Sequence, residues 1–125
     1  MTAGAAGASR PLVEVCFLLG VGGALLWADV GDDATSLGDS RARWEAVWAH
    51  RGELGEIVHS HPGGSLRFSL EDESTMKAID AGLGRRLDYG IVSPAGYLRR
   101  RGDGSESRVT DEPWWTRLLR AASGL

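Results

Sequence analysis

The chain has 125 residues, of which 42% are hydrophobic and 25% charged, and these values are those of a single globular domain. A net charge of −3 gives no sign of the strongly basic face that binds nucleic acid, so we expect no nucleic-acid partner. One cysteine cannot form an internal disulfide, and no apolar run is long enough for a membrane span. The N-terminus lacks the basic start and following apolar run of a signal peptide, so we expect a cytoplasmic protein without membrane attachment.

The first 30 residues predict a tail followed by two strands. Residues 1–10 are small and Gly/Ala-rich, so we expect a disordered tail there and the folded domain over residues 11–125. Residues 12–19 are mostly apolar, which predicts a central strand buried on both faces, with Cys16 as a small buried hydrophobe. A glycine-rich turn then leads to a second strand over residues 24–30.

A helix and a short strand are predicted next. Residues 31–38 are polar and predict a loop, after which Asp39 or Ser40 can cap a helix. The residues at helical spacing that we expect to form its buried stripe are Trp44, Val47 and Trp48. Residues 56–58 predict a short strand, and ligand sites in α/β sheets favour the carboxyl ends of such strands.

The following segment predicts a second helix and a hairpin. The helix opens at Ser69, and its apolar residues at helical spacing are Met76, Ile79 and Leu83. Two glycines, Gly82 and Gly84, are expected to end it. Residues 89–93 and 97–101 then predict a hairpin around a Pro-Ala-Gly turn.

A weak strand near Val109 and an amphipathic helix from Pro113 complete the predicted elements. The apolar residues of that helix are Trp114, Trp115, Leu118 and Leu119. The order is strands, helix, strand, helix, strands and helix. It indicates an α/β (α+β) fold in which a mixed β-sheet is flanked by helices.

Two histidines stand two residues apart in the segment His59-Ser60-His61-Pro62. Side chains alternate along a strand, so both imidazoles project from one face and can reach one metal ion. Asp72 falls where the next helix begins, and its carboxylate can supply a third ligand. Two histidines and a carboxylate with an open fourth position form the ligand set of a catalytic zinc ion (Zn²⁺). Helix capping is a compatible alternative for Asp72, because Ser69-x-x-Asp72 resembles a capping box.

The spacing His-x-His-x10-Asp, with a serine three residues before the Asp, resembles the JAMM (MPN+) metalloprotease family, especially its small prokaryotic JAB-domain members. The segment PLVEVCFLLG over residues 11–20 resembles the family's Glu-x-Cys-Gly-Leu-Leu-Gly signature and places Glu14 at the position of the general base. The resemblance covers residues 11–100. It implies the JAB/MPN fold, which is related to the cytidine-deaminase architecture.

The resemblance implies a catalytic role for two further residues. Glu14 would take a proton from the attacking water and deliver it to the leaving amine. A carboxylate on an apolar strand is costly to bury without such a partner. Ser69 occupies the position that donates a hydrogen bond to the oxyanion, and a helix N-cap is the alternative role for it. Phe17 and Phe68 depart from the family at positions where glycine and proline are usual, which bears on the shape of the substrate groove.

Other polar residues are expected to be structural. Ser60 should face away from the histidine pair and support its loop, and His50 should be a surface residue at the end of a helix. Residues 99–101, three arginines, predict a solvated hairpin end, with a docking patch for an acidic protein surface as the alternative. The acidic residues expected to be helix or loop charges are Glu45, Glu53 and Glu56.

The implied activity is that of a zinc-dependent peptidase or isopeptidase. In the prokaryotic members of the resembled family, the substrate is a ubiquitin-like or sulfur-carrier protein cleaved after its C-terminal Gly-Gly. Our first expectation is processing or deconjugation of a bacterial ubiquitin-like protein, with E1-like and E2-like proteins of the pathway as partners. Alternatives are maturation of a sulfur carrier in cysteine or siderophore biosynthesis, hydrolysis of short peptides, and a non-catalytic MPN-type interaction module.

Overall fold

The computed structural model describes residues 11–33 and 40–125. The expected N-terminal tail, most of the predicted loop over residues 31–38 and the candidate cap Asp39 lie outside the described residues. Ser40 lies inside them and caps the first described helix, where its hydroxyl accepts a hydrogen bond from the Arg43 N–H at 3.1 Å.

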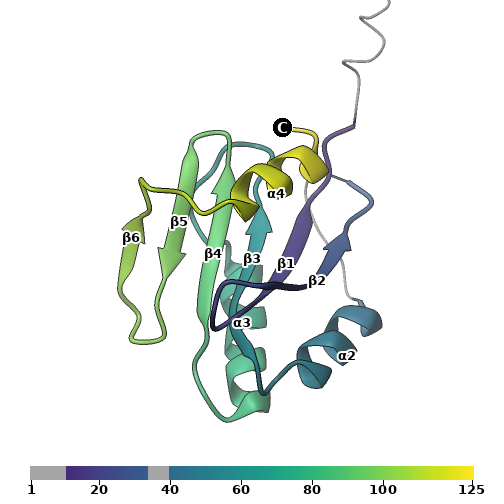
Figure 1. The fold of residues 1–125 in the computed structure, drawn as a ribbon, viewed down its shortest axis with the longest axis vertical. Coiled ribbons are helices and arrows are strands. Elements are labelled where there is room, and N and C mark those ends of the chain that lie inside the picture. Colours follow the sequence, from purple (N-terminus) through teal and green to yellow (C-terminus); the bar gives the residue numbers. More distant parts are fainter. Residues whose placement is uncertain (1–10, 34–39) are drawn as a thin grey trace, which may run out of the picture.

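Within the described residues, one mixed sheet has the strand order β2-β1-β3-β4-β5-β6 (Figure 1). The strands β3 and β4 pair in parallel, whereas the other neighbouring pairs are antiparallel. The strands are β1 (Val15–Gly20), β2 (Leu25–Val30), β3 (Leu54–Ser60), β4 (Asp88–Ser93), β5 (Gly96–Arg100) and β6 (Glu106–Arg108).

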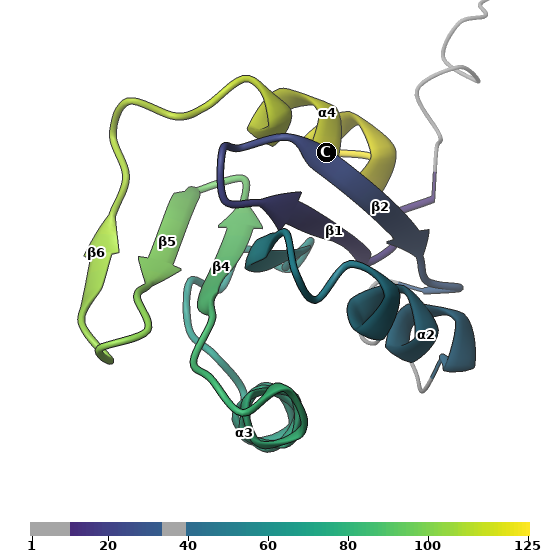
Figure 2. The same ribbon diagram turned by 60° about the horizontal axis from the view of Figure 1, so that its bottom comes forward.

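Helices cover both faces of this sheet. The helices α2 (Arg41–Ala49) and α3 (Leu70–Leu83) lie on one face, and α4 (Trp115–Ser123) lies on the other (Figure 2). The helix α3 connects the parallel strands β3 and β4, as a parallel pair requires a crossover. The predicted class, a mixed sheet flanked by helices, is therefore confirmed. No helix among the described residues is long and apolar enough to cross a membrane.

The strand β1 lies between two apolar layers. Its alternate residues Cys16 and Leu18 face the side of α2 and α3, while Val15 and Phe17 face α4, and all four are at most 2% exposed. The predicted central strand, buried on both faces, is confirmed, but it begins at Val15, and Leu12 is 42% exposed. Because side chains alternate along a strand, the side chain of Glu14, which precedes Val15, points to the side of α2 and α3.

The predicted stripe of α2 was wrong for its two tryptophans. Trp44 is 38% exposed and Trp48 is 56% exposed, whereas Val47 is 4% exposed and packs in the core with Ala46. The helix rests on the sheet through these smaller side chains. The Trp48 ring is instead covered by the guanidinium of Arg51, 4.0 Å from the ring centroid, a cation–π contact that suits a surface position.

The helix α4 begins two residues later than its sequence pattern suggested. Pro113 stands before the N-cap residue, Trp114, which is 61% exposed. The buried stripe consists of Trp115, Thr116, Leu119 and Ser123. The expected members Trp114 and Leu118 lie outside it: Trp114 is the N-cap and is 61% exposed, and Leu118 is 45% exposed because it lies about 100° around the helix from Leu119.

Two smaller boundaries also differ from the prediction. Gly84 ends α3 in the left-handed conformation at φ 70°, which a glycine adopts without strain, whereas Gly82 lies inside the helix. The weak strand β6 ends one residue before Val109, whose N–H donates to the Tyr97 carbonyl at 2.9 Å.

Candidate metal centre

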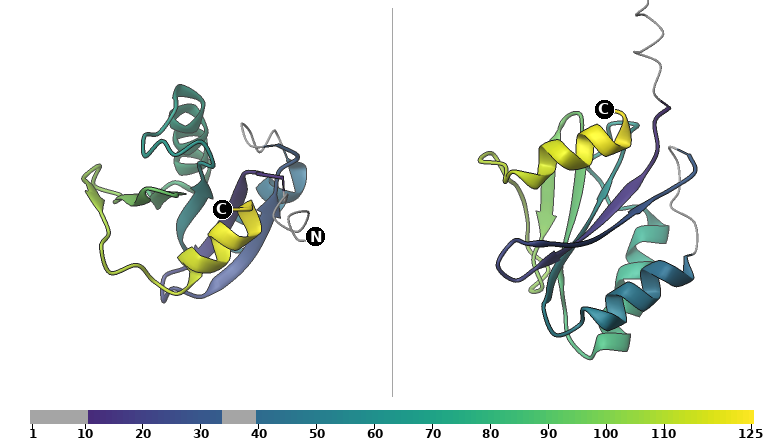
Figure 3. Two further views of the ribbon diagram at one scale, coloured as in Figure 1. Left: turned by 90° about the horizontal axis from the view of Figure 1, so that it is seen from above. Right: turned by 45° about the vertical axis from the view of Figure 1, so that its right-hand side comes forward.

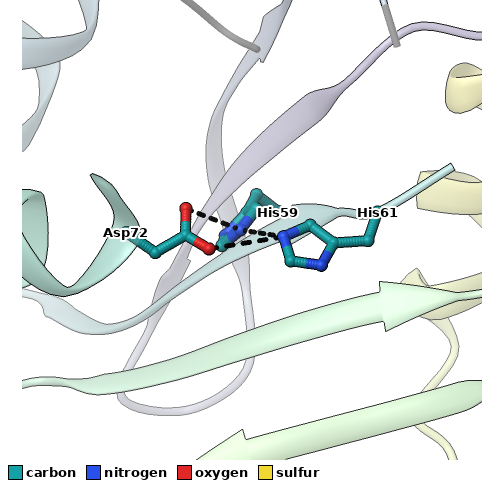
Figure 4. A group of neighbouring side chains, drawn as sticks. All are labelled: His59, His61 and Asp72. Atoms are coloured by element: carbon teal, nitrogen blue, oxygen red, sulfur yellow. Dashed lines mark hydrogen bonds and ion pairs between the residues drawn. The ribbon is translucent and has the colours of Figure 1, made fainter. Parts of the chain in front are cut away.

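Three predicted ligands meet at the carboxyl end of β3 and the start of α3 (Figure 4). The Nε2 atoms of His59 and His61 are 2.9 Å apart. From Asp72, Oδ1 lies 3.3 Å from the His59 Nε2 atom, and Oδ2 lies 3.4 Å from the His61 Nε2 atom. His59 is part of β3, His61 follows it directly, and Asp72 belongs to the first turn of α3.

These separations fit one metal ion. A four-coordinate ion with bonds of about 2.0–2.1 Å keeps neighbouring ligand atoms roughly 3.3 Å apart. One ligand atom from each of His59, His61 and Asp72 lies within 4.8 Å of the others. Imidazole nitrogen and carboxylate oxygen are both established ligands of divalent metals. The group can therefore bind a metal with its three residues and leave a further position for substrate or water.

A backbone carbonyl sets the tautomer of His61. The Nδ1 atom of His61 lies 3.0 Å from the carbonyl oxygen of Ser65, and a carbonyl can only accept, so Nδ1 carries the proton. When the ring is neutral, Nε2 is thus the unprotonated atom that faces the other two ligands and can bind a metal. Without a metal, burial acts to lower the pKa of His61, but hydrogen bonds to Asp72 and Ser65 outweigh burial and raise that pKa. Such support of a ligand histidine by a second hydrogen bond is typical of metal sites.

The carboxylate of Asp72 is fixed by a capping box. The Ser69 N–H donates to Asp72 Oδ2 at 2.8 Å, and the Asp72 N–H donates to Ser69 Oγ at 3.0 Å. The capping role expected of Asp72 is therefore confirmed, and the bonds that begin the helix also orient its carboxylate toward the two histidines. A serine hydroxyl that accepts a hydrogen bond can also donate one, so capping does not exclude the oxyanion role of Ser69.

Arg100 ties the start of α3 to the sheet. Its guanidinium forms two hydrogen bonds with Glu73, the residue after Asp72, and pairs also with Glu106 on β6. The same guanidinium lies 4.5 Å from the ring centroid of Phe68, a buried residue whose ring neighbours His59 at 6.3 Å. The expectation of a solvated arginine end was thus wrong for Arg100, because its charge is neutralised by acids on two elements.

Glu56 also differs from its prediction. It lies on β3, is 5% exposed, and bonds to the Tyr97 hydroxyl and the Arg99 guanidinium on the α4 side of the sheet. Gly90 makes room for it, since a Cβ there would lie 2.7 Å from Glu56 Oε2. Glu56 is therefore a buried structural charge that faces away from the ligands. His50 is the C-cap of α2, as expected of a residue at a helix end.

Glu14 precedes β1 directly and shares a cleft with the three ligands. The cleft, about 1040 Å³, lies between α2 and α3 and is lined by Glu14, the ligands, Ser69 and apolar residues of both helices and the sheet. In the β1–β3 register Cys16 stands opposite His59, so two further steps bring Glu14 opposite His61. The sequence had related these residues only through the resemblance to a family.

Burial changes the acidity of both carboxyls. It raises the pKa of Glu14 from 4.5 to about 7, although His61 opposes the rise. Burial also acts to raise the pKa of Asp72, but hydrogen bonds with His59 and His61 outweigh it and hold that pKa well below its usual range. Asp72 is thus ionised, as a ligand must be, and Glu14 titrates near neutrality, as a general base should.

The raised pKa of Glu14 predicts a gain in stability when the acid is removed. Its ionisation is less favourable in the folded state, so folding stability falls as the pH rises from about 4.5 through about 7. In metal-free protein at pH 8, Glu14→Gln should therefore raise the free energy of unfolding by up to about 3 kcal/mol. Urea unfolding at pH 8 and pH 4 measures this. A Gln variant that is no more stable than wild type at pH 8, or equally stabilised at pH 4, would contradict the prediction.

The chain is also similar in sequence to a known protein family. A family model described as prokaryotic homologs of the JAB domain matches residues 14–102. The matched span begins at Glu14 and contains His59, His61, Ser69 and Asp72. A search of curated proteins gives no significant match.

Proposed function

The chain belongs to the family of prokaryotic JAB-domain homologues, and from that membership and its ligand geometry we propose that it is a zinc-dependent peptidase or isopeptidase. The observation that carries the proposal is the convergence of His59, His61 and Asp72 in a cleft that also holds Glu14. With a pKa near neutrality, the Glu14 carboxylate can both accept and release a proton in this cleft.

Zinc is the proposed ion because two imidazoles and one carboxylate are a ligand set of catalytic zinc sites. When bound, zinc would supply Lewis acidity, which polarises a carbonyl and lowers the pKa of water. Hydrogen bonds within the chain orient the ligands for this ion. The Ser65 carbonyl fixes the neutral His61 tautomer that carries its proton on Nδ1, and the Ser69 N–H orients the Asp72 carboxylate.

Glu14 and Ser69 are the proposed catalytic residues. Glu14 accepts a proton from the water whose oxygen bonds to the scissile carbonyl carbon, and it passes that proton to the nitrogen as the C–N bond breaks. The products are a carboxylic acid and an amine. Ser69 lines the cleft beside Asp72, where its hydroxyl can donate to the oxygen of the attacked carbonyl.

The proposed substrate is a bacterial ubiquitin-like protein cleaved after its C-terminal Gly-Gly, in precursor processing or deconjugation. Burial of the ligands supports a slender substrate: the side chains of His59, His61 and Asp72 are 13%, 15% and 20% exposed. A tail without Cβ atoms can bring its carbonyl to such recessed ligands with the least steric hindrance. A sulfur carrier shares this tail, so both kinds of substrate belong in the assay.

The activity is tested with zinc-loaded protein and candidate ubiquitin-like and sulfur-carrier proteins that bear an extension after Gly-Gly. We expect mass spectrometry to show cleavage directly after the second glycine, and no cleavage when valines replace both glycines. His61→Ala is the matched control and should be inactive. If zinc-loaded wild type cleaves none of these proteins and no short peptide, the non-catalytic interaction module is the correct function.

A further inference from the structure

Two buried serines meet on the face of the sheet opposite to the metal centre. Ser60 is the last residue of β3 and Ser123 the last of α4, and both are 0% exposed. Their hydroxyl oxygens are 2.9 Å apart. Ser60 also stands between His59 and His61 in the chain, with its side chain on the other face, as expected from strand alternation.

Both serines bond to the backbone on either side of Glu14. The Val15 N–H donates to Ser60 Oγ at 2.9 Å. Ser123 Oγ donates to the Val13 carbonyl oxygen at 2.5 Å, and the Val13 N–H donates to the Ser123 carbonyl at 3.1 Å. Three backbone groups that flank Glu14 are thus held by Ser60 and Ser123.

These bonds begin where the β1–β3 ladder stops. Its last pair is Cys16 with His59, and at the next step Val15 bonds to the side chain of Ser60. Glu14 uses its own N–H and C=O on the β2 side, with Asp33 and Gly31 as partners at 2.8 and 2.7 Å. Successive backbone groups of a strand point to alternate sides, so those of Val13 and Val15 face β3, where the serines provide their partners.

The end of α4 is built for this close approach to the chain before β1 (Figure 3). Gly124 ends the helix at φ 86°, and a Cβ there would lie 2.8 Å from the Pro11 carbonyl oxygen. Glycine is therefore needed here for two reasons: it adopts the left-handed conformation that ends the helix, and it has no Cβ to collide with Pro11. Ser123 lies outside the matched span of residues 14–102, so the link joins α4 to the part of the chain that carries the site.

We propose that Ser60 and Ser123 are positioning residues for Glu14. They fix the backbone of residues 13–15, and alternation along the strand then holds the Glu14 carboxylate in the cleft beside His61. Ser60 joins the strand of the base to the strand of the ligands, so it sets the spacing between them. The catalytic consequence rests on the proposed peptidase function, in which a displacement of about 1 Å can cost roughly 100-fold in rate.

Ser60→Ala and Ser123→Ala test the proposal in the zinc-loaded protein, well below the melting temperature of each variant. We expect kcat to fall about 10- to 100-fold while KM and zinc content stay at wild-type values. Ser93→Ala is the matched control. Ser93 is also 0% exposed and its hydroxyl accepts the Ala95 N–H at 3.0 Å, but it lies on β4, away from Glu14. It should lose similar stability and keep its kcat.

Amide hydrogen exchange gives a second readout that needs no substrate. In Ser60→Ala the Val15 amide loses its acceptor and should exchange about tenfold faster. In Ser123→Ala the Val13 amide should exchange faster, because the bond from Ser123 Oγ that holds the Val13 carbonyl is lost. The Leu18 amide should keep its wild-type rate in both variants. Values of kcat within twofold of wild type, an equal loss in Ser93→Ala, or unchanged exchange at residues 13–15 would overturn the proposal. Failure of zinc-loaded wild type to cleave any substrate would instead overturn the proposed function, and the exchange measurement would still decide whether the serines hold this segment.

Discussion

Replacement of Glu14 by Gln is expected to lower kcat by about 100- to 10,000-fold and to leave the metal bound. An amide keeps the size of the side chain but accepts no proton at neutral pH. The three ligands lie on β3, directly after it and on α3, and their supporting bonds to Ser65 and Ser69 do not involve Glu14. Steady-state kinetics with a cleavable substrate and the zinc content of the same sample measure both parts of the prediction.

Glu56→Gln is the control for this experiment. It alters a second buried carboxylate, but one that faces α4 and bonds to Tyr97 and Arg99. We expect this variant to lose stability, because Arg99 loses its charged partner, and to keep kcat within about threefold of wild type. If the Glu14→Gln variant cleaved at the wild-type rate, Glu14 would not be the base. If only Glu56→Gln were inactive, the roles would be reversed.

Removal of the metal by a strong chelator is expected to abolish cleavage and leave the fold nearly native. The two apolar layers on either side of β1 are formed by side chains other than the ligands. The capping box of Asp72 and the bond from His61 to Ser65 do not involve a metal. They should therefore hold the ligand side chains in place after the metal is removed. Structural zinc sites in small fingers behave differently, because there the metal supplies the folding energy.

Tryptophan fluorescence follows this experiment. Trp115 is a buried residue of α4, on the face of the sheet opposite to the cleft, and its emission should not change when the metal leaves. Trp44 lines the cleft, so a small change is expected from it. The melting temperature should fall, because a ligand that binds only the folded state stabilises it. Added zinc should restore both activity and melting temperature. Unfolding on chelation at room temperature would show that the metal is structural.

Features set by local patterns could be predicted from the sequence. His59 and His61 lie two residues apart at the end of one extended segment, and Ser69 with Asp72 fits a helix start, so short-range geometry brings these residues into position. The class of fold followed from the alternation of strands and helices. Glu14 was placed near the ligands only through its resemblance to a family signature, since pairing of β1 with β3 joins residues that lie 34 to 43 positions apart in the chain.

Features that depend on tertiary packing were missed. Helical spacing grouped Trp44 and Trp48 with Val47, but spacing does not tell which part of an apolar arc meets the sheet. Arg100 and Glu56 looked like surface charges, because their partners Glu73 and Arg99 are distant in the chain. The bond between Ser60 and Ser123 spans 63 residues and has no sequence signal of its own, since serine is common in loops and at helix ends.

The central claim is that His59, His61 and Asp72 hold one zinc ion. Elemental analysis of the purified protein and of His59→Ala, His61→Ala and Asp72→Ala measures this directly. We predict one zinc per chain in wild type and in Glu14→Gln, and strongly reduced zinc in each ligand variant, with the fold retained. Wild-type protein that contains no zinc and takes up none on titration would contradict the account, as would ligand variants that bind zinc as tightly as wild type.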